Sequence, residues 1–315
     1  MLQIVLIGFG AGAAAALLFA SVASGSALAL SLFYLAPLPI LIVGLGWSHW
    51  AALIAAASAA VLLAIEGGLV SLVFLIGIAL PGWGLSYLAL LARPVPEGQE
   101  WYPVGRLVLW AALISALIVG AALLGMGVDA ESLRATLHQM IETLLAGVSG
   151  VENPEDTARL VDLLVAITPA AVGASMLIII VVNLWLAGRI VRISGRLPRP
   201  WPSLPGMRFP VLAPAALGAA IAGAFLPGLA GIASSALAAA LMMAHVLLGL
   251  AVIHTLTAGL AMRGLILGAL YAAILVLGRP VSWPLLLVGL LGIAEALFDV
   301  RGLIARWGGP PAAAS

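Results

Sequence analysis

The sequence predicts an all-α fold: a polytopic bundle of about ten transmembrane helices, with one amphipathic helix outside the membrane. The first observation is composition, since the 315 residues are 64% hydrophobic and 8% charged, with a mean hydropathy of +1.25. Soluble domains are about half apolar and about a quarter charged. The second is the length of the apolar runs, because a membrane crossing needs about 20 such residues. We therefore expect a multi-pass membrane protein that contacts the lipid bilayer.

Ten stretches are candidate spans. They are residues 3–24, 28–46, 49–66, 69–92, 105–127, 163–188, 210–226, 229–261, 264–278 and 283–304. The first lacks the basic stretch that precedes a secretory signal, so we expect a span rather than a cleaved leader. The stretch 229–261 is long for one crossing and 264–278 is short, so eight or nine crossings remain open alternatives.

Arginines in short loops indicate which loops face the cytoplasm. The loop 189–208 is basic and has no acidic residue, whereas the interval 128–162 is mainly acidic. We therefore place the loop in the cytoplasm and the interval outside, which puts both termini in the cytoplasm. Only Arg134, Arg159 and Arg279 of the 13 arginines then lie outside. This distribution agrees with the excess of arginine expected in cytoplasmic loops.

The outside interval predicts helical structure rather than a plain loop. Leu133, Leu137 and Leu144 recur at helical spacing after Asp129, which predicts an N-capped amphipathic helix along the outer surface. A second helix should begin at Pro154, with Asn153 as its cap. The chain is thereby divided into an N-terminal five-span bundle at 1–127, the extracytoplasmic segment 128–162, and a C-terminal transmembrane region at 163–315.

Polar side chains inside membrane spans carry most information, because each needs a partner there. Asn183, His245 and His254 are three such residues, and Pro169 should bend the span that contains Asn183. The two histidines are nine residues apart on one helix, so they project from opposite faces and cannot form a two-histidine metal site. Structural hydrogen bonding and a ligand or proton site are the alternatives for each.

Glu295 lies near the middle of the last span. It shares a helix face with Asp299, four residues later, which is unfavourable unless a cation, a proton or an arginine lies between them. On a continuous helix Arg301 points about 200° away from Asp299, so we do not expect Arg301 to be the natural partner on that helix. A buried carboxylate must then be protonated or hydrogen-bonded to another span. Glu295 is either a structural pairing residue or a ligand or proton site.

Gly8, Gly12 and Ala16 form a small-residue face on the first span, suited either to internal packing or to docking of a partner subunit. Catalytic and nucleotide-binding motifs are missing from the sequence, so we expect neither an enzyme nor a bound cofactor. The absence of cysteine excludes disulfides and thiolate metal sites. A net charge of +1 gives no reason to expect nucleic acid as a partner.

Two stretches carry a resemblance to a known family. One has Pro169 followed by Asn183 near the end of its span. The other has Gly249 and His254 in a glycine-to-histidine pattern, followed by the terminal run "VGLLGIAEALFDVRG". With these features the chain resembles the YybS-like bacterial membrane proteins (domain of unknown function 2232). Phe298, Asp299 and Arg301 match the end of the family's terminal signature, and Glu295 stands where an aspartate is usual.

The resemblance implies a binding or transport subunit, or a scaffold, in the bacterial cytoplasmic (inner) membrane. The family's N-terminal half is similar in style to the substrate-binding subunits of energy-coupling-factor transporters and to MreD. Its partners would be a separate ATPase for a substrate-binding or permease-like transport subunit, or envelope proteins for a scaffold in cell-shape assembly. A buried polar cavity joining Glu295 to Asn183 or to a membrane histidine would favour transport. A Glu295 that faces only arginine or backbone would favour the scaffold.

Overall fold

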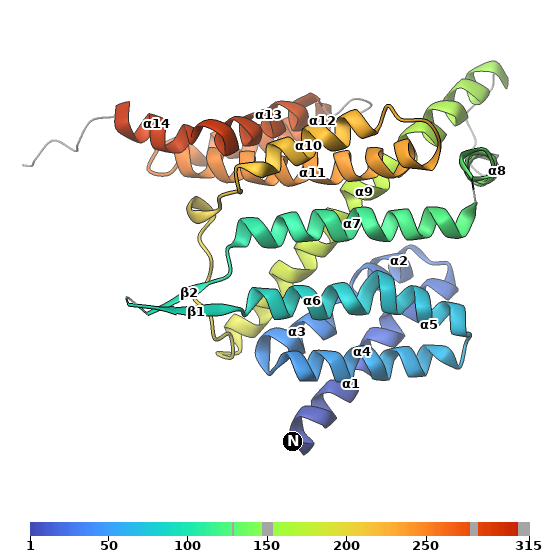
Figure 1. Ribbon diagram of the computed structural model, residues 1–315, viewed down its shortest axis with the longest axis horizontal. Helices are drawn as coiled ribbons and strands as arrows, with labels where there is room; N and C mark the ends of the chain where they lie inside the picture. Colours follow the sequence, from blue (N-terminus) through green and yellow to red (C-terminus); the bar gives the residue numbers. More distant parts are fainter. Residues whose placement is uncertain (97, 128, 147–153, 278–282, 308–315) are drawn as a thin grey trace, which may run out of the picture. The chain divides into compact units, whose positions relative to one another are not determined.

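A computed structural model describes residues 1–315 apart from 97, 128, 147–153, 278–282 and 308–315 (Figure 1). The regular elements of the described chain are helices, apart from one two-stranded hairpin, which confirms the predicted all-α class. By its internal contacts it divides into two compact units. Unit 1 comprises Met1–Ala122 with Ser175–Trp201, and unit 2 comprises Leu123–Ala174 with Pro202–Ser315. The division of the sequence into residues 1–127, 128–162 and 163–315 was based on which side of the membrane each part faces. It stays a prediction, because the two units are defined by contacts instead.

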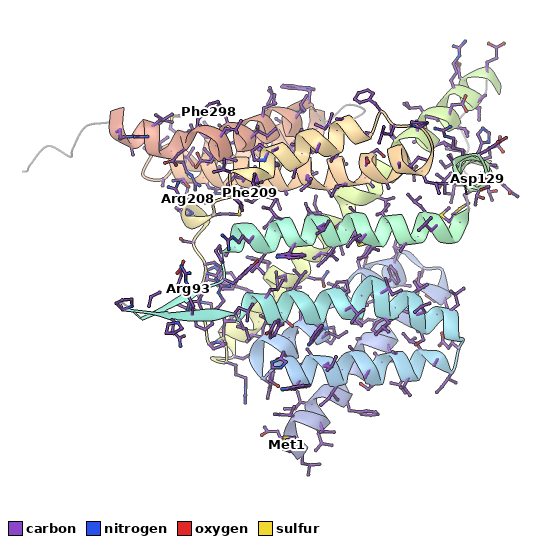
Figure 2. All side chains as sticks on the ribbon, in the orientation of Figure 1. Met1, Arg93, Asp129, Arg208, Phe209 and Phe298 are labelled. Carbon is purple, nitrogen blue, oxygen red and sulfur yellow. The ribbon has the colours of Figure 1, made fainter. Side chains whose placement is uncertain are left out.

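Unit 1 contains the first helices and the hairpin. These are α1 (Leu2–Ala20), α2 (Ala27–Tyr34), α3 (Leu38–Gly46), α4 (His49–Ala64), α5 (Gly68–Phe74), α6 (Leu80–Ala89), β1 (Ala92–Val95) and β2 (Gly98–Trp101). Most of α7 (Val104–Met126) and the end of α9 (Pro154–Ile193) complete it. The hairpin, which the sequence did not indicate, carries Arg93 (Figure 2), whose Nη2 lies 2.6 Å from Glu100 Oε2.

The small-residue face of α1 packs inside unit 1. A Cβ atom on Gly8 would meet the Ala51 carbonyl oxygen at 2.9 Å, and one on Gly12 would meet that of Ala55 at 2.5 Å. Ala16 is buried on the same face. Because these residues have almost no side chain, the backbones of α1 and α4 approach closely. Within this unit the face therefore serves internal packing.

Two spans of unit 1 are interrupted near their middles. The first consists of α2 and α3, separated by a turn at residues 35–37 that ends in Pro37. The second consists of α5 and α6, joined by a π-helical turn at Leu75–Ala79. Proline lacks an N–H group, and π-helical turns are frequent at functional sites.

Unit 2 contains the remaining helices. These are α8 (Ala130–Ala146), α10 (Leu212–Gly223), α11 (Gly228–Leu256), α12 (Arg263–Leu277), α13 (Trp283–Phe298) and α14 (Val300–Trp307), with the first part of α9. Helices α11 and α13 pack together through glycines (Figure 1). A Cβ atom on Gly249 would overlap the Val288 carbonyl oxygen, and one on Gly292 would overlap that of His245. Gly249 is therefore needed for this close crossing.

The count of ten spans is not confirmed. Six described helices are long and apolar enough to cross a membrane, and α13 with α14 makes up to seven if that pair, bent by 71°, is one span. Three further predicted spans are short helices, at His49–Ala64, Leu212–Gly223 and Arg263–Val276. A helix of 12 residues is about 18 Å long against a hydrocarbon core of about 30 Å.

The predicted amphipathic helix is α8. Its cap is confirmed, because Asp129 Oδ1 accepts a 2.7 Å hydrogen bond from the backbone N–H of Ser132. Leu133 and Leu137 are buried, whereas Leu144 is 70% exposed. Helix α9 begins at Pro154, as predicted, while Asn153 lies outside the described residues. It continues as one helix through Pro169, and a bend there stays a prediction.

Candidate functional site

Glu295 is buried near the end of α13, where the last apolar stretch changes direction. Helix α13 ends at Phe298, and α14 begins at Val300 after a single intervening residue. That residue, Asp299, has a φ of 49°, in the left-handed region that non-glycine residues other than Asn and Asp rarely adopt. The axis consequently bends by 71° between the two helices.

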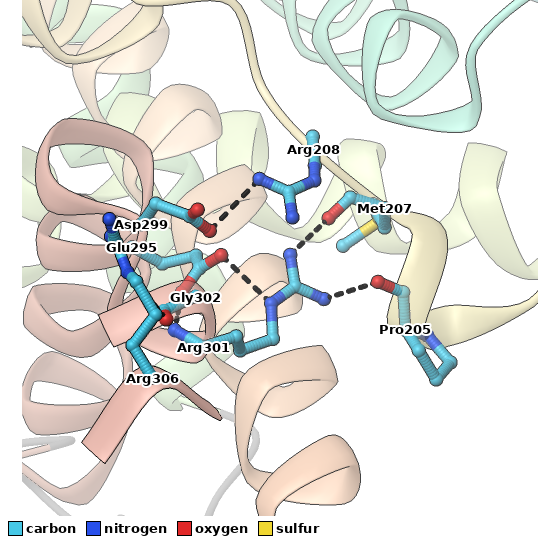
Figure 3. A network of polar contacts seen from close by, with 8 residues as sticks. All are labelled: Pro205, Met207, Arg208, Glu295, Asp299, Arg301, Gly302 and Arg306. Atoms are coloured by element: carbon cyan, nitrogen blue, oxygen red, sulfur yellow. Dashed lines mark hydrogen bonds and ion pairs between the residues drawn. The ribbon is translucent and has the colours of Figure 1, made fainter. Parts of the chain in front are cut away.

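This bend brings Arg301 back to Glu295 (Figure 3). Arg301 Nε donates to Glu295 Oε1 at 2.8 Å, and the backbone N–H of Arg301 donates to Oε2 at 3.0 Å. Both side chains are buried, with 7% and 3% of their surface exposed. The expectation that Arg301 is not the partner was wrong, because it assumed a continuous helix. The carboxylate also caps the first turn of α14, where unpaired N–H groups favour a negative charge.

The rest of the Arg301 guanidinium binds the loop before α10. Nη1 donates to the Pro205 carbonyl oxygen at 2.7 Å, and Nη2 donates to that of Met207 at 2.6 Å. The planar fork of donors allows one arginine to hold a carboxylate and two carbonyl groups together. Arg301 thus fixes the loop, the end of α13 and the start of α14 to one another (Figure 3).

A second ion pair lies beside the first and was not expected from the sequence. Arg208 Nη1 donates to Asp299 Oδ1 at 2.9 Å, with side chains 63% and 43% exposed (Figure 3). The Asp299 carboxylate also lies against Gly302, where a Cβ atom would overlap it. The sequence shows Asp299, Arg301 and Gly302 as near neighbours. It does not show that Arg208 lies beside them, because Arg208 belongs to a loop 91 residues earlier in the chain.

The Glu295–Arg301 pair is buried, in contrast to the exposed pair beside it. Among the described residues Glu295 has Arg301 as its sole partner, through both carboxylate oxygens. Charge-assisted bonds of this kind are strong and directional, and removing one member of a buried pair is strongly destabilising. Chemically, the arrangement suits a permanent clamp more than a group that exchanges protons.

Asn183 belongs to unit 1 and satisfies the backbone at an interrupted span. Its Nδ2 donates at 2.9 Å both to the Tyr34 carbonyl oxygen and to that of Ile179. In a continuous helix the Tyr34 carbonyl would accept from the N–H of Leu38, but that group bonds to Leu35. Since an unpaired backbone group is costly in a membrane, Asn183 replaces the missing helical bond.

The two membrane histidines have separate surroundings. His245 is fully buried, with Nδ1 2.8 Å from the Leu241 carbonyl oxygen and its ring 5.3 Å from that of Phe209. His254 Nε2 lies 2.9 Å from the hydroxyl of Tyr271. Phe298, the aromatic residue of the family signature, is 63% exposed. In the described parts of the chain, no group of three or more His, Asp or Glu side chains is arranged to hold a metal ion.

Two cavities are described, and none of Glu295, Asn183, His245 and His254 lines either. The cavity of unit 1 is about 160 Å³ and is lined by apolar residues such as Leu41, Ile78 and Ile180, together with Tyr34. That of unit 2 is more open, about 640 Å³, and is lined by Pro169 together with charged residues of α8. The polar cavity that would have favoured transport through Glu295 is therefore not one of these two.

Arginines of the basic loop stack on tryptophans of unit 1. The guanidinium–ring distances are 5.8 Å for Arg189 and 5.2 Å for Arg192 over Trp201, 4.5 Å for Arg196 over Trp47, and 5.9 Å for Arg199 over Trp101. Arg199 also donates to the Ala89 carbonyl oxygen at 2.7 Å, and burial lowers the pKa of its guanidinium. Such contacts are typical of an anchored membrane–water boundary.

No family model, curated protein or solved structure matches the chain. The likeness to the YybS-like proteins therefore stays a prediction from the motif residues. Of those residues, Gly249 lies at a helix crossing, Asn183 at a helix break, and Asp299 and Arg301 at the bend.

Proposed function

We propose that this protein is a multi-pass scaffold of the bacterial inner membrane that organises partner proteins of the cell envelope. The observation that carries the proposal is that the Glu295 carboxylate binds the side chain and the backbone N–H of Arg301. A carboxylate that couples transport has to release its partner and bind a proton or a ligand. Glu295 instead holds one side chain with 3% of its surface exposed. The scaffold alternative accounts for this arrangement better than the transport alternative.

The proposed topology keeps ten crossings with both termini in the cytoplasm. It is supported by the arginine–tryptophan contacts of residues 189–201, which suit the inner interface. In this topology the three short helices cross where the bilayer is locally thinned. A reporter fused next to Arg199 should read as cytoplasmic, and a periplasmic reading would reject the orientation.

A substrate-binding or permease-like subunit is the second candidate, and the cavities favour it. An interrupted-helix cavity inside a small bundle is a common feature of membrane binding proteins. In that case the partner should be a separate ATPase subunit.

Capture of the full-length protein from native membranes, followed by mass spectrometry, separates the two functions. We expect envelope or cell-shape proteins to be recovered, while recovery of ATPase subunits would support transport instead. The matched variant is the doubly neutral Glu295→Gln/Arg301→Gln chain. If this chain folds and still restores the phenotype of a deletion strain, the carboxylate is not a coupling group. A folded but inactive double variant would contradict the scaffold proposal.

A further inference from the structure

The apolar cavity of unit 1 lies where its two interrupted spans meet. Tyr34 and Pro37 line it from the break between α2 and α3, and Gly77 and Ile78 line it from the π-helical turn. Helix α9 closes another side with Ile179 and its neighbours. Asn183, one turn further along α9, holds the Tyr34 carbonyl group. Two helix irregularities therefore lie at this one location.

The chemistry of the lining restricts the ligand class. The lining side chains are apolar, except for the phenol of Tyr34, and none is charged. The volume of about 160 Å³ is close to that of an engineered apolar cavity of about 150 Å³ which stays dry and binds benzene. A cavity of this kind accepts a short stretch of hydrocarbon and rejects a charged head group.

The cavity is also accessible from the surface of the unit. Of its lining residues, Tyr34 is 41% exposed and Val73 is 54% exposed. For a chain that spans a membrane, the medium at such an apolar surface is lipid hydrocarbon. Close packing is normal in protein interiors, so a gap that is open to this medium is favourable to fill with the end of a hydrocarbon chain.

We propose that this cavity binds the hydrocarbon chain of a membrane lipid, with the head group left outside the lining. The site goes beyond the scaffold function and does not depend on it. The chain is either fatty acyl or isoprenoid, since both present the same neutral hydrocarbon to the lining.

Glycines provide a matched pair of variants. A Cβ atom at Gly77 meets nothing within 4 Å, and the same holds for Gly84 in the same span. Gly77 lines the cavity, whereas Gly84 does not. Gly77→Phe should therefore fill the cavity, and Gly84→Phe places the same ring on the same span elsewhere.

The test is photolabelling of the purified full-length protein with two probes, a diazirine fatty acid and a diazirine isoprenoid alcohol. Labelled peptides are mapped by mass spectrometry. We expect labelling of peptides that contain Leu41 and Ile78, reduced by about tenfold in Gly77→Phe and unchanged in Gly84→Phe. The probe that labels identifies the source of the chain. Equal labelling of both variants, or no cavity peptide labelled by either probe, would overturn the proposal.

A second pair of variants tests the site if Gly77→Phe does not fold. Val73→Trp should block the mouth of the cavity, and Val61→Trp is its control, because Val61 is 69% exposed on α4 and does not line the cavity. Loss of labelling in Val73→Trp alone supports the site. Retained labelling in a folded Val73→Trp protein contradicts it. Photolabelling does not depend on the capture of partner proteins. The lipid site and the scaffold function can therefore be rejected independently of each other.

Discussion

Arg301 Nε lies 2.8 Å from Glu295 Oε1 across a turn at which the helix axis bends by 71°. The ion pair and the bend depend on each other. Without the left-handed residue at position 299 the guanidinium would point elsewhere. Without the ion pair a buried carboxylate would lie beside the first turn of α14 with no cation.

Arg301→Gln should destabilise unit 2 by about 3–5 kcal/mol, because it leaves the Glu295 carboxylate buried without its cation. Glu295→Gln should destabilise the unit by a similar amount, because it leaves the Arg301 guanidinium buried without its anion. The double variant Glu295→Gln/Arg301→Gln should lose less than the sum of the two single losses. Denaturant unfolding in detergent measures all three, and strictly additive losses would mean that the pair is not coupled.

Asp299 is constrained by its backbone rather than by its exposed ion pair. Asp299→Asn should change stability by less than about 1 kcal/mol, since asparagine tolerates the left-handed region and exposed pairs contribute little. Asp299→Val should cost about 1–2 kcal/mol or more, because a β-branched side chain is strained there. Thermal unfolding of the two proteins compares them directly, and equal stability would argue against a positive φ at this position.

Gly12 and Gly10 form a matched pair on α1. A Cβ atom at Gly12 meets the Ala55 carbonyl oxygen at 2.5 Å, whereas one at Gly10 meets nothing within 4 Å. Gly12→Ala should therefore destabilise the packing of α1 on α4 by about 1–3 kcal/mol. Gly10→Ala should stabilise by about 0.5–1 kcal/mol, since alanine is the better helix former. If the two variants unfold at the same denaturant concentration, the close crossing is refuted.

Asn183→Leu should destabilise unit 1 by about 1–3 kcal/mol, because it leaves the Tyr34 carbonyl group buried without a donor. Ser194→Ala, in the turn directly after the same helix, is a suitable control. The Ser194 hydroxyl is exposed and donates to the Ile190 carbonyl oxygen of α9. Hydrogen exchange at the α2–α3 break should rise in Asn183→Leu and not in the control. Unchanged exchange in both would remove the capping role of Asn183.

Asp129 should make the start of α8 sensitive to acid. Hydrogen bonds from Ser132, backbone first and then side chain, lower the pKa of Asp129 from its ordinary 3.8. A lowered folded-state pKa means that its contribution is present above the unfolded pKa and is lost as the pH falls through the folded value. Protease sensitivity of α8 should therefore increase below about pH 4. Asp129→Asn should keep the cap and lose this pH dependence. If the variant is still sensitive to acid, another group is responsible for the effect.

The helices themselves could be predicted because their apolar runs are long. Residues 105–127 were expected as one span, and the helix there is Val104–Met126. The cap at Asp129 and the helix start at Pro154 are likewise local signals, readable from neighbouring residues. The lengths of the helices were harder to predict. Residues 210–226 are apolar enough for a span, but only Leu212–Gly223 is helical.

The surroundings of Glu295 could be predicted only in part. The sequence indicated that this carboxylate needs a partner, which follows from burial alone. It did not identify Arg301, because the direction of a side chain two residues past Asp299 depends on one backbone angle. Arg208 and the carbonyl groups of Pro205 and Met207 come from a loop whose position depends on tertiary packing. The breaks at Pro37 and in the π-helical turn also lie within apolar runs, where the hydrophobic pattern continues without change.

The contacts of Arg301 have a consequence for the order of synthesis. The arginine follows its acceptors Pro205 and Met207 by 96 and 94 residues. At about 5–20 residues per second, a ribosome needs roughly 5–20 seconds to make that much chain. For that interval the loop before α10 has been made but has no guanidinium to bind. A chain that stops short of its last span therefore lacks the side chain that holds this loop in place.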